Sequence, residues 1–199
     1  MTTIIALCGP AGSGKTTVAS YLIEKYGARR YGFATPLKEM VKRALDFTDE
    51  QVYGTQEQKE AVDPRYGHSP RWFLQRIGTE GCRAVFGEDF WTRQCIDTIK
   101  RDAPCLAVID DLRFADEAHA VQWSGLVASV LRLWPVGDRV ALERAAAAGS
   151  HASEEQWKQL TADIEITPET RGVDVLLKAV DNAMTLLNIQ PTMTRGVRW

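Results

Sequence analysis

A stretch of nine residues near the start of the chain constrains its fold more than any other feature. Residues Gly9–Thr17 fit the phosphate-binding pattern G-x-x-x-x-G-K-[ST], known as a P-loop. The apolar run Ile4–Cys8 precedes this loop and predicts a buried strand. The segment Val18–Tyr26 follows it and predicts a helix that ends at Gly27. This order of strand, loop and helix is the context that the pattern requires, and it predicts a site for nucleotide phosphates.

The chemistry of phosphate binding explains the residue types in this loop. Glycines allow backbone N–H groups to turn toward phosphate oxygens, and the N-terminus of the helix adds a partial positive charge. Lys15 is expected to reach the β- and γ-phosphates of ATP, and the hydroxyl of Thr16 is expected to bind Mg²⁺. The loop residues predicted to bind ATP are Gly9, Pro10, Ala11, Gly12, Ser13, Gly14, Lys15, Thr16 and Thr17.

The composition is that of a soluble globular protein. The chain has 199 residues, of which 45% are hydrophobic and 25% are charged, enough for one α/β domain with a sizeable core. Its net charge is −2 and it has no basic block, which argues against a general nucleic-acid binder but is compatible with a free nucleotide. The N-terminus lacks the features of a signal peptide, and no apolar run approaches the ~20 residues that span a bilayer. We therefore expect a cytoplasmic protein without a membrane or stable nucleic-acid partner.

The cysteines and histidines give little sign of a metal centre. None of the four cysteines forms a C-x-x-C pair, and the three histidines are not spaced with them as zinc ligands. Cys8 and Cys105 lie in predicted buried strands. We therefore expect core thiols in a reducing compartment.

Apolar periodicity and turn residues predict alternating strands and helices in the rest of the chain. Further strands are expected at 28–33, 105–109, 126–133 and 163–166, and helices at 35–45, 70–86, 90–100, 115–123 and 173–187. The fold class is therefore α/β: a three-layer P-loop fold with a parallel sheet of about five strands. We expect a helical insertion that binds the molecule accepting the phosphoryl group, called the acceptor, and a short lid. We expect one domain over 1–199, with its core at 1–35, 101–134 and 160–190, the acceptor-binding region at 36–100 and the lid at 135–153.

Three local features of the helical region can be checked against a structure. Thr35 is expected to cap the first helix, with Pro36 at its first position and one apolar face that includes Met40. Residues 54–69 are polar and are expected to be irregular. Two glycines inside the helix at 70–86, Gly78 and Gly81, indicate close approach of the backbone to a partner helix or a ligand.

An acidic pair, Asp110 and Asp111, directly ends the apolar run at 105–109. In P-loop folds an acidic residue at the end of a neighbouring parallel strand holds Mg²⁺ or its water. The alternative is an ordinary strand-end turn, in which aspartate is common. We favour a metal or catalytic role for Asp111.

Other motifs narrow the class of P-loop protein. A GTPase switch would need N-K-x-D and D-x-x-G motifs, and neither is present. A transporter-type ATPase would carry an ABC-type signature, which is also absent. A small-substrate kinase needs an acceptor pocket, and the helical region carries side chains that clamp phosphates, read base edges or stack on bases: Arg65, Arg71, Trp72, Gln75, Arg76, Arg83 and Trp91. Lys38 lies in the first turn of a predicted helix, where a positive charge is unfavourable for the helix dipole. A bound anion would explain why a lysine stands there.

The segment 135–153 contains Arg139 and Arg144 and is interpreted as an arginine-bearing lid. Such a lid excludes water and brings guanidinium groups to the phosphoryl group in transfer. The alternative is a plain surface helix with charge pairs.

An ordered set of motifs resembles the phage-type deoxynucleoside monophosphate kinases. Leu74–Glu80, followed by Arg83 and Trp91, is similar to their L-Q-x-x-G-T-[DE] helix and downstream tryptophan. Further matches in the same order are Phe33–Lys38, the D-x-R motif Asp111–Arg113 with Phe114 and Glu117, Leu131–Arg132, and His151–Glu154. Together with the P-loop, the resemblance covers residues 4–154.

The resemblance implies transfer of the γ-phosphoryl group of ATP to a deoxynucleoside monophosphate, with ATP and Mg²⁺ as cofactors. It implies catalytic roles for Lys15, Asp111, Arg113 and Arg132, Mg²⁺ binding by Thr16 and Asp111, and ATP contacts from Arg139 and Arg144. It implies that the acceptor is bound by Lys38, Arg65, Arg71, Gln75, Thr79, Arg83 and Trp91. Two alternatives stay open: a kinase of another small acceptor, such as a modified nucleotide or a sugar acid, and an ATP-binding regulatory module. The apolar helix faces are compatible with a monomer or a homodimer.

Overall fold

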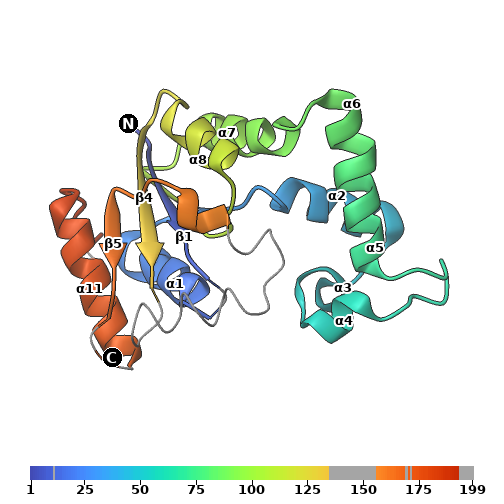
Figure 1. The fold of residues 1–199 in the computed structure, drawn as a ribbon, viewed down its shortest axis with the longest axis horizontal. Coiled ribbons are helices and arrows are strands. Elements are labelled where there is room, and N and C mark those ends of the chain that lie inside the picture. The colour runs from blue at the N-terminus through green and yellow to red at the C-terminus, as the bar shows by residue number, and fades with distance from the viewer. Residues whose placement is uncertain (11, 135–155, 169, 171, 193–199) are drawn as a thin grey trace. The chain divides into compact units, whose positions relative to one another are not determined.

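A computed structural model describes residues 1–10, 12–134, 156–168, 170 and 172–192. The chain divides into two compact units, one formed by residues 1–32 and 98–199 and the other by residues 33–97 (Figure 1). No helix in the described part of the chain combines the length and the apolar character that crossing a membrane requires.

The first unit is built on a parallel sheet of five strands. In sheet order the strands are β2 (Arg29–Tyr31), β3 (Leu106–Ile109), β1 (Thr3–Cys8), β4 (Val127–Leu133) and β5 (Ile164–Ile166). Every neighbouring pair is parallel. This confirms the predicted α/β fold class and the number of strands. The central position of β1 puts the loop that follows it at the middle of the carboxyl edge of the sheet.

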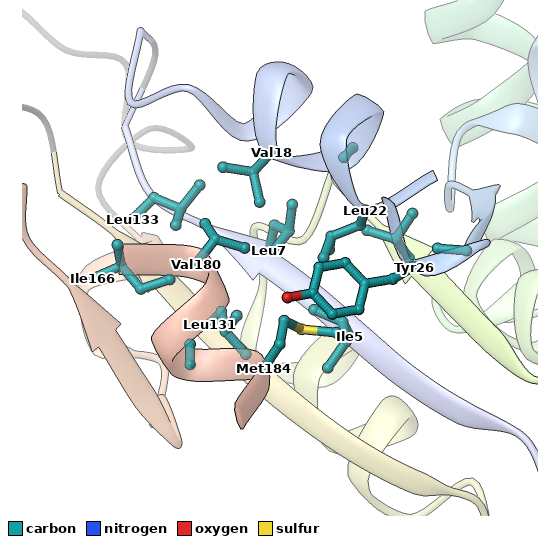
Figure 2. Packing of buried hydrophobic residues seen from close by; sticks show 14 of the residues in the cluster. Ile5, Leu7, Val18, Leu22, Tyr26, Leu131, Leu133, Ile166, Val180 and Met184 are labelled. Carbon is teal, nitrogen blue, oxygen red and sulfur yellow. The ribbon is translucent and has the colours of Figure 1, made fainter. Parts of the chain in front are cut away.

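Two helices cover one face of this sheet (Figure 1). They are α1 (Lys15–Tyr26) and α11 (Val173–Leu186). Figure 2 shows their apolar side chains packed on those of β1 and β4, with Leu7 and Met184 fully buried in the same cluster. The sequence pattern places these side chains correctly because residues at i, i+3 and i+4 share one helix face.

The opposite face of the sheet contacts α8 (Ala115–Gln122). Residues Gln156–Gln159 form a 3₁₀ turn. The strand bounds correct one expectation about the thiols. Cys105 precedes β3 and is exposed, whereas Cys8, inside β1, is fully buried as predicted.

The second unit is helical. Its elements are α2 (Thr35–Leu45), α3 (Asp49–Tyr53), α4 (Gln56–Glu60), α5 (Pro70–Gln75), the π-helical segment η1 (Arg76–Arg83), α6 (Ala84–Phe86) and the start of α7 (Phe90–Asp102). Ser69 and Pro70 begin α5 as predicted, since the Ser69 hydroxyl accepts the N–H of Trp72.

Three predictions for the second unit are wrong. Residues 54–69 are not uniformly irregular, because Thr55 begins α4 with a capping box that Gln58 completes. The first helix includes Thr35 and is preceded by Ala34, so Thr35 is not its cap. Met40 lies on this helix but is 42% exposed, outside the buried face.

Candidate active site

The P-loop connects the end of β1 to the start of α1 in a conformation that depends on glycine. Gly14, which directly precedes α1, has a φ of 91°, a left-handed value that other residues adopt at a cost. A Cβ atom at Gly9 would lie 2.3 Å from the carbonyl oxygen of Leu133 in β4. The loop therefore needs glycine at its first position for close packing and at its last position for backbone geometry.

The donors in this loop suit a phosphate group. The Nζ atom of Lys15 donates to the carbonyl oxygens of Gly9 and Pro10, at 2.8 and 2.7 Å, so the ammonium group lies against the start of the loop. The hydroxyl of Ser13 is buried and makes no hydrogen bond with the described residues. Among the described residues no side chain caps α1, and its first turn has no acidic residue, so the positive end of the helix favours an anion. These three observations indicate that the site fits the phosphates of ATP.

The two aspartates after β3 lie at the same edge of the sheet as the P-loop. Ala6 of β1 is in register with Ile109 of β3, which places Asp110 and Asp111 level with the last residues of β1. Asp110 forms a bidentate ion pair with Arg30 of β2, with nitrogen-to-oxygen distances of 2.5 and 3.1 Å. Arg30 was not identified from the sequence. Its position in the strand next to β3 makes it the partner of Asp110.

A buried carboxylate holds the loop that follows Asp111. One oxygen of Glu117, in the first turn of α8, accepts the backbone N–H groups of Arg113 and Phe114, at 2.8 and 3.1 Å. Burial raises the pKa of Glu117 to about 7, against the lowering effect of the two N–H groups, and the charge of Asp111 adds to the increase. Glu117 thus fixes the backbone that carries Asp111 and Arg113, a role that the sequence motif by itself does not reveal.

The raised pKa of Glu117 predicts how stability depends on pH. Between about pH 4.5 and pH 7 the folded protein retains a proton that the unfolded chain has lost. The free energy of unfolding should therefore fall as pH rises through this range, by at most about 3 kcal/mol. Glu117→Gln keeps an accepting oxygen but cannot ionise, so it should flatten this slope. Urea unfolding of both proteins at pH 5 and pH 8 measures the difference, and parallel slopes would contradict the prediction.

Arg132 of β4, for which the resemblance implies a catalytic role, has partners inside the first unit. Its side chain is buried, and its guanidinium group contacts Glu165 of β5 at 2.7 Å and the carbonyl oxygen of Leu160. A guanidinium group held by internal partners is less available to a nucleotide, because leaving Glu165 unpaired is costly. Arg113, by contrast, is exposed.

The predicted acceptor residues of the second unit fall into two groups. Gln75, Thr79 and Arg71 are exposed along α5 and η1, and Arg83 is half-buried at the end of η1. Lys38 lies over the ring of Tyr53, with Nζ 4.9 Å from the ring centroid. All five have polar groups that a nucleotide could contact, four of them along α5 and η1 and Lys38 on α2.

Two other predicted acceptor residues form bonds or contacts within the second unit. Arg65 directs its Nε and Nη2 atoms to both oxygens of the buried Asp63, at 3.0 and 2.8 Å, and these bonds hold the pKa of Asp63 well below its usual range. Trp91 is only 5% exposed and lies in the apolar cluster that includes Leu37 and Val41. Its burial corrects the expectation that it stacks on a nucleobase. Trp72 is less buried and stacks on His68, with ring centroids 4.0 Å apart.

Some predicted residues lie outside the described part of the chain. They are Ala11 in the P-loop, and Arg139 and Arg144 in the segment 135–153 that was interpreted as a lid.

Comparison with known proteins gives the family of the chain. The family model of deoxynucleotide monophosphate kinase matches residues 3–66. A protein of Acanthamoeba polyphaga mimivirus, provisionally named deoxynucleotide monophosphate kinase, is 40% identical over 137 residues, which cover 61% of this chain and 69% of the viral protein. The chain belongs to the deoxynucleotide monophosphate kinase family.

Other relatives of this kinase are more distant. The deoxynucleoside-5′-monophosphate kinase of Escherichia phage T5 is 27% identical over 181 residues, which cover 61% of this chain and 72% of the phage enzyme. Among solved structures, dephospho-CoA kinase from Campylobacter jejuni is 11% identical and has a TM-score of 0.49, with 94% of this chain and 98% of that chain covered. The family model and the two viral proteins confirm the resemblance found in the sequence motifs at the level of the family.

Proposed function

We propose that this kinase transfers the γ-phosphoryl group of ATP to a deoxynucleoside 5′-monophosphate. A phosphate oxygen of the acceptor forms a bond to the γ-phosphorus while the bond to the β-phosphate oxygen of ATP breaks, which gives ADP and a deoxynucleoside diphosphate. The observation that carries the proposal is the ammonium group of Lys15 inside a P-loop, in a chain of this family. Membership of the family supports the acceptor, and the loop supports the donor.

The residues of the first unit act on the donor mainly by neutralising charge. Phosphoryl transfer between two anions requires in-line positioning and electrostatic stabilisation more than acid or base catalysis. Lys15 and the first-turn N–H groups of α1 bind the phosphates. The Thr16 hydroxyl and the Asp111 carboxylate would hold Mg²⁺, which would offset the negative charge of the phosphates. The ion pair of Asp110 with Arg30 supports Asp111 as the residue that acts.

The second unit supplies the acceptor side of the proposed reaction. The amide of Gln75 is suited to the edge of a base, and Thr79 offers a hydroxyl on the same exposed segment. Arg71 and Arg83 are suited to the acceptor phosphate, because a guanidinium group binds phosphate oxygens in pairs. Lys38 adds a positive charge, and Arg139 and Arg144 remain proposed lid residues. We propose that the kinase works in the cytoplasm, or in the host cytoplasm if a phage encodes it.

A panel of acceptors tests this function. Purified protein with ATP and Mg²⁺ is given dAMP, dGMP, dCMP, dTMP, dUMP, the corresponding ribonucleotides or gluconate, and release of ADP is followed. We expect at least one deoxynucleoside monophosphate to raise ADP release about tenfold or more above the rate without acceptor. The Lys15→Ala variant gives the background from contaminating ATPases. Release with gluconate alone would indicate a sugar-acid kinase, and binding of ATP without release for any acceptor would indicate a regulatory module.

A further inference from the structure

The acceptor-side helix is not an α-helix throughout. Residues Arg76–Arg83 form η1, a π-helical segment of 8 residues between α5 and α6. A π-helix is rare, forms i→i+5 hydrogen bonds and is usually limited to a single turn at a functional site. Because each turn takes up about one residue more than an α-helical turn, the segment changes the directions in which later side chains leave the axis.

Two neighbouring elements hold η1 at Gly78. A Cβ atom at Gly78 would lie 2.6 Å from a terminal methyl carbon of Leu37 in α2, so the absence of a side chain allows close packing there. On α7, the indole N–H of Trp91 donates to the carbonyl oxygen of Gly78 at 3.1 Å, in a buried hydrogen bond. Gly81, which was also expected to mark a close approach, has no such contact and is exposed.

The burial of Trp91 indicates what this bond does. The ring is packed in the core of the second unit, so its one polar atom is directed to the π-helical backbone. Gln75 and Thr79, on the same stretch of helix, are exposed. The Trp91 bond therefore adds a polar contact to the apolar packing of Ile77 and Cys82, and it joins the core to the segment that carries the exposed acceptor residues.

We propose that Trp91 is a positioning residue, whose indole N–H holds the carbonyl of Gly78 and so keeps η1 in the π-helical form that directs Gln75, Thr79 and Arg83 toward the acceptor nucleotide. The hydrogen bond itself is seen in the structure. The role of η1 in binding the acceptor rests on the proposed function. It differs from a role in stacking, because stacking needs an aromatic ring and positioning needs the N–H donor.

A variant that removes only the donor separates these roles. Trp91→Phe keeps an aromatic ring, and Trp91 replaced by 3-benzothienylalanine keeps the shape of the indole while a sulfur atom takes the place of the N–H. The second substitution serves if the smaller phenylalanine ring disturbs folding. Trp157→Phe is the matched control, since Trp157 is 4% exposed and packs against Trp134 in the first unit.

The first measurement is hydrogen exchange of residues 76–84 without nucleotides, which does not depend on the proposed function. Both Trp91 variants should exchange faster at 76–84 than wild type. The Trp157→Phe control should exchange there like wild type, and exchange of the peptide over the P-loop should be unchanged. Wild-type exchange at 76–84 in both Trp91 variants would overturn the proposal, whether or not the protein proves to be a kinase.

The second measurement is the dependence of the rate on each substrate. We expect KM for the deoxynucleoside monophosphate to rise about five- to tenfold in both Trp91 variants, the scale of one lost buried hydrogen bond. KM for ATP and kcat should stay within about twofold, a pattern that general destabilisation does not produce. Faster exchange with an unchanged acceptor KM would show that η1 does not present the acceptor, and would overturn that part of the proposal.

Discussion

Lys15→Ala is expected to lower kcat by at least about 100-fold, the scale of removing one preorganised electrostatic donor from a reaction that depends on charge neutralisation. The Nζ atom of Lys15 lies within 2.8 Å of two carbonyl oxygens at the start of the P-loop. When the phosphates of ATP are bound, this ammonium group can exchange a carbonyl oxygen for a charged phosphate oxygen, which attracts it more strongly. The measurement is ADP release at saturating ATP and acceptor.

Two comparisons make this result specific to the loop. Lys25→Ala removes one positive charge from the same helix, where Lys25 pairs with Asp181 at 2.7 Å, and should leave kcat within about threefold. Thermal unfolding of Lys15→Ala checks that loss of the two internal bonds has not unfolded the protein. Near-normal turnover in a folded Lys15→Ala variant would rule out the assigned role.

Asp111→Asn is expected to lower kcat about 10- to 100-fold, whereas Asp110→Asn should leave it within about threefold. Both aspartates follow β3 at the edge of the sheet beside the P-loop, but Asp110 is committed to Arg30 through two hydrogen bonds. Loss of the charge at Asp111 would weaken the site for Mg²⁺. Loss of the charge at Asp110 would weaken its ion pair with Arg30, which should lower the stability of the protein rather than its turnover.

The pair of variants is its own control, because the same atom change is made at adjacent positions. Raising the Mg²⁺ concentration should partly restore Asp111→Asn and should not change Asp110→Asn. The opposite ranking of the two variants would make Asp110 the metal ligand and would mean that the ion pair with Arg30 opens when nucleotides bind.

Much of the fold follows from local sequence patterns. The β1–P-loop–α1 unit, the helix end at Gly27 and the start of α5 at Ser69 and Pro70 all depend on residues within one or two turns of each other. The helix α4 was missed although Thr55–Gln58 fits a capping box, so a usable signal was present there. The π-helical form of η1 had only an indirect signal, the glycine at 78.

Site residues were predicted less well where the fold has already paired their side chains. Arg65, Trp91 and Arg132 have side chains suited to nucleotide binding. The sequence assigns Arg65 to it by residue type, Arg132 by resemblance to the family motifs, and Trp91 by both. In the structure Arg65 is paired with Asp63, Trp91 with the carbonyl of Gly78, and Arg132 with Glu165. A residue type states which bonds a side chain can form, but not which of them the fold has already used.

Local sequence patterns establish a P-loop on a parallel sheet, because a P-loop is a continuous segment whose geometry is encoded by its own glycines and lysine. The ordered motifs after the loop, rather than the loop, indicate a kinase. Which polar residues near the loop are already paired with other partners depends on the tertiary structure. Arg30 and Asp110 are 80 residues apart and meet because β2 and β3 pair. Glu117 is buried because α8 packs on the sheet. Such pairings depend on how strands and helices assemble, and burial changes the energy of a charge far more than its neighbours in the sequence do.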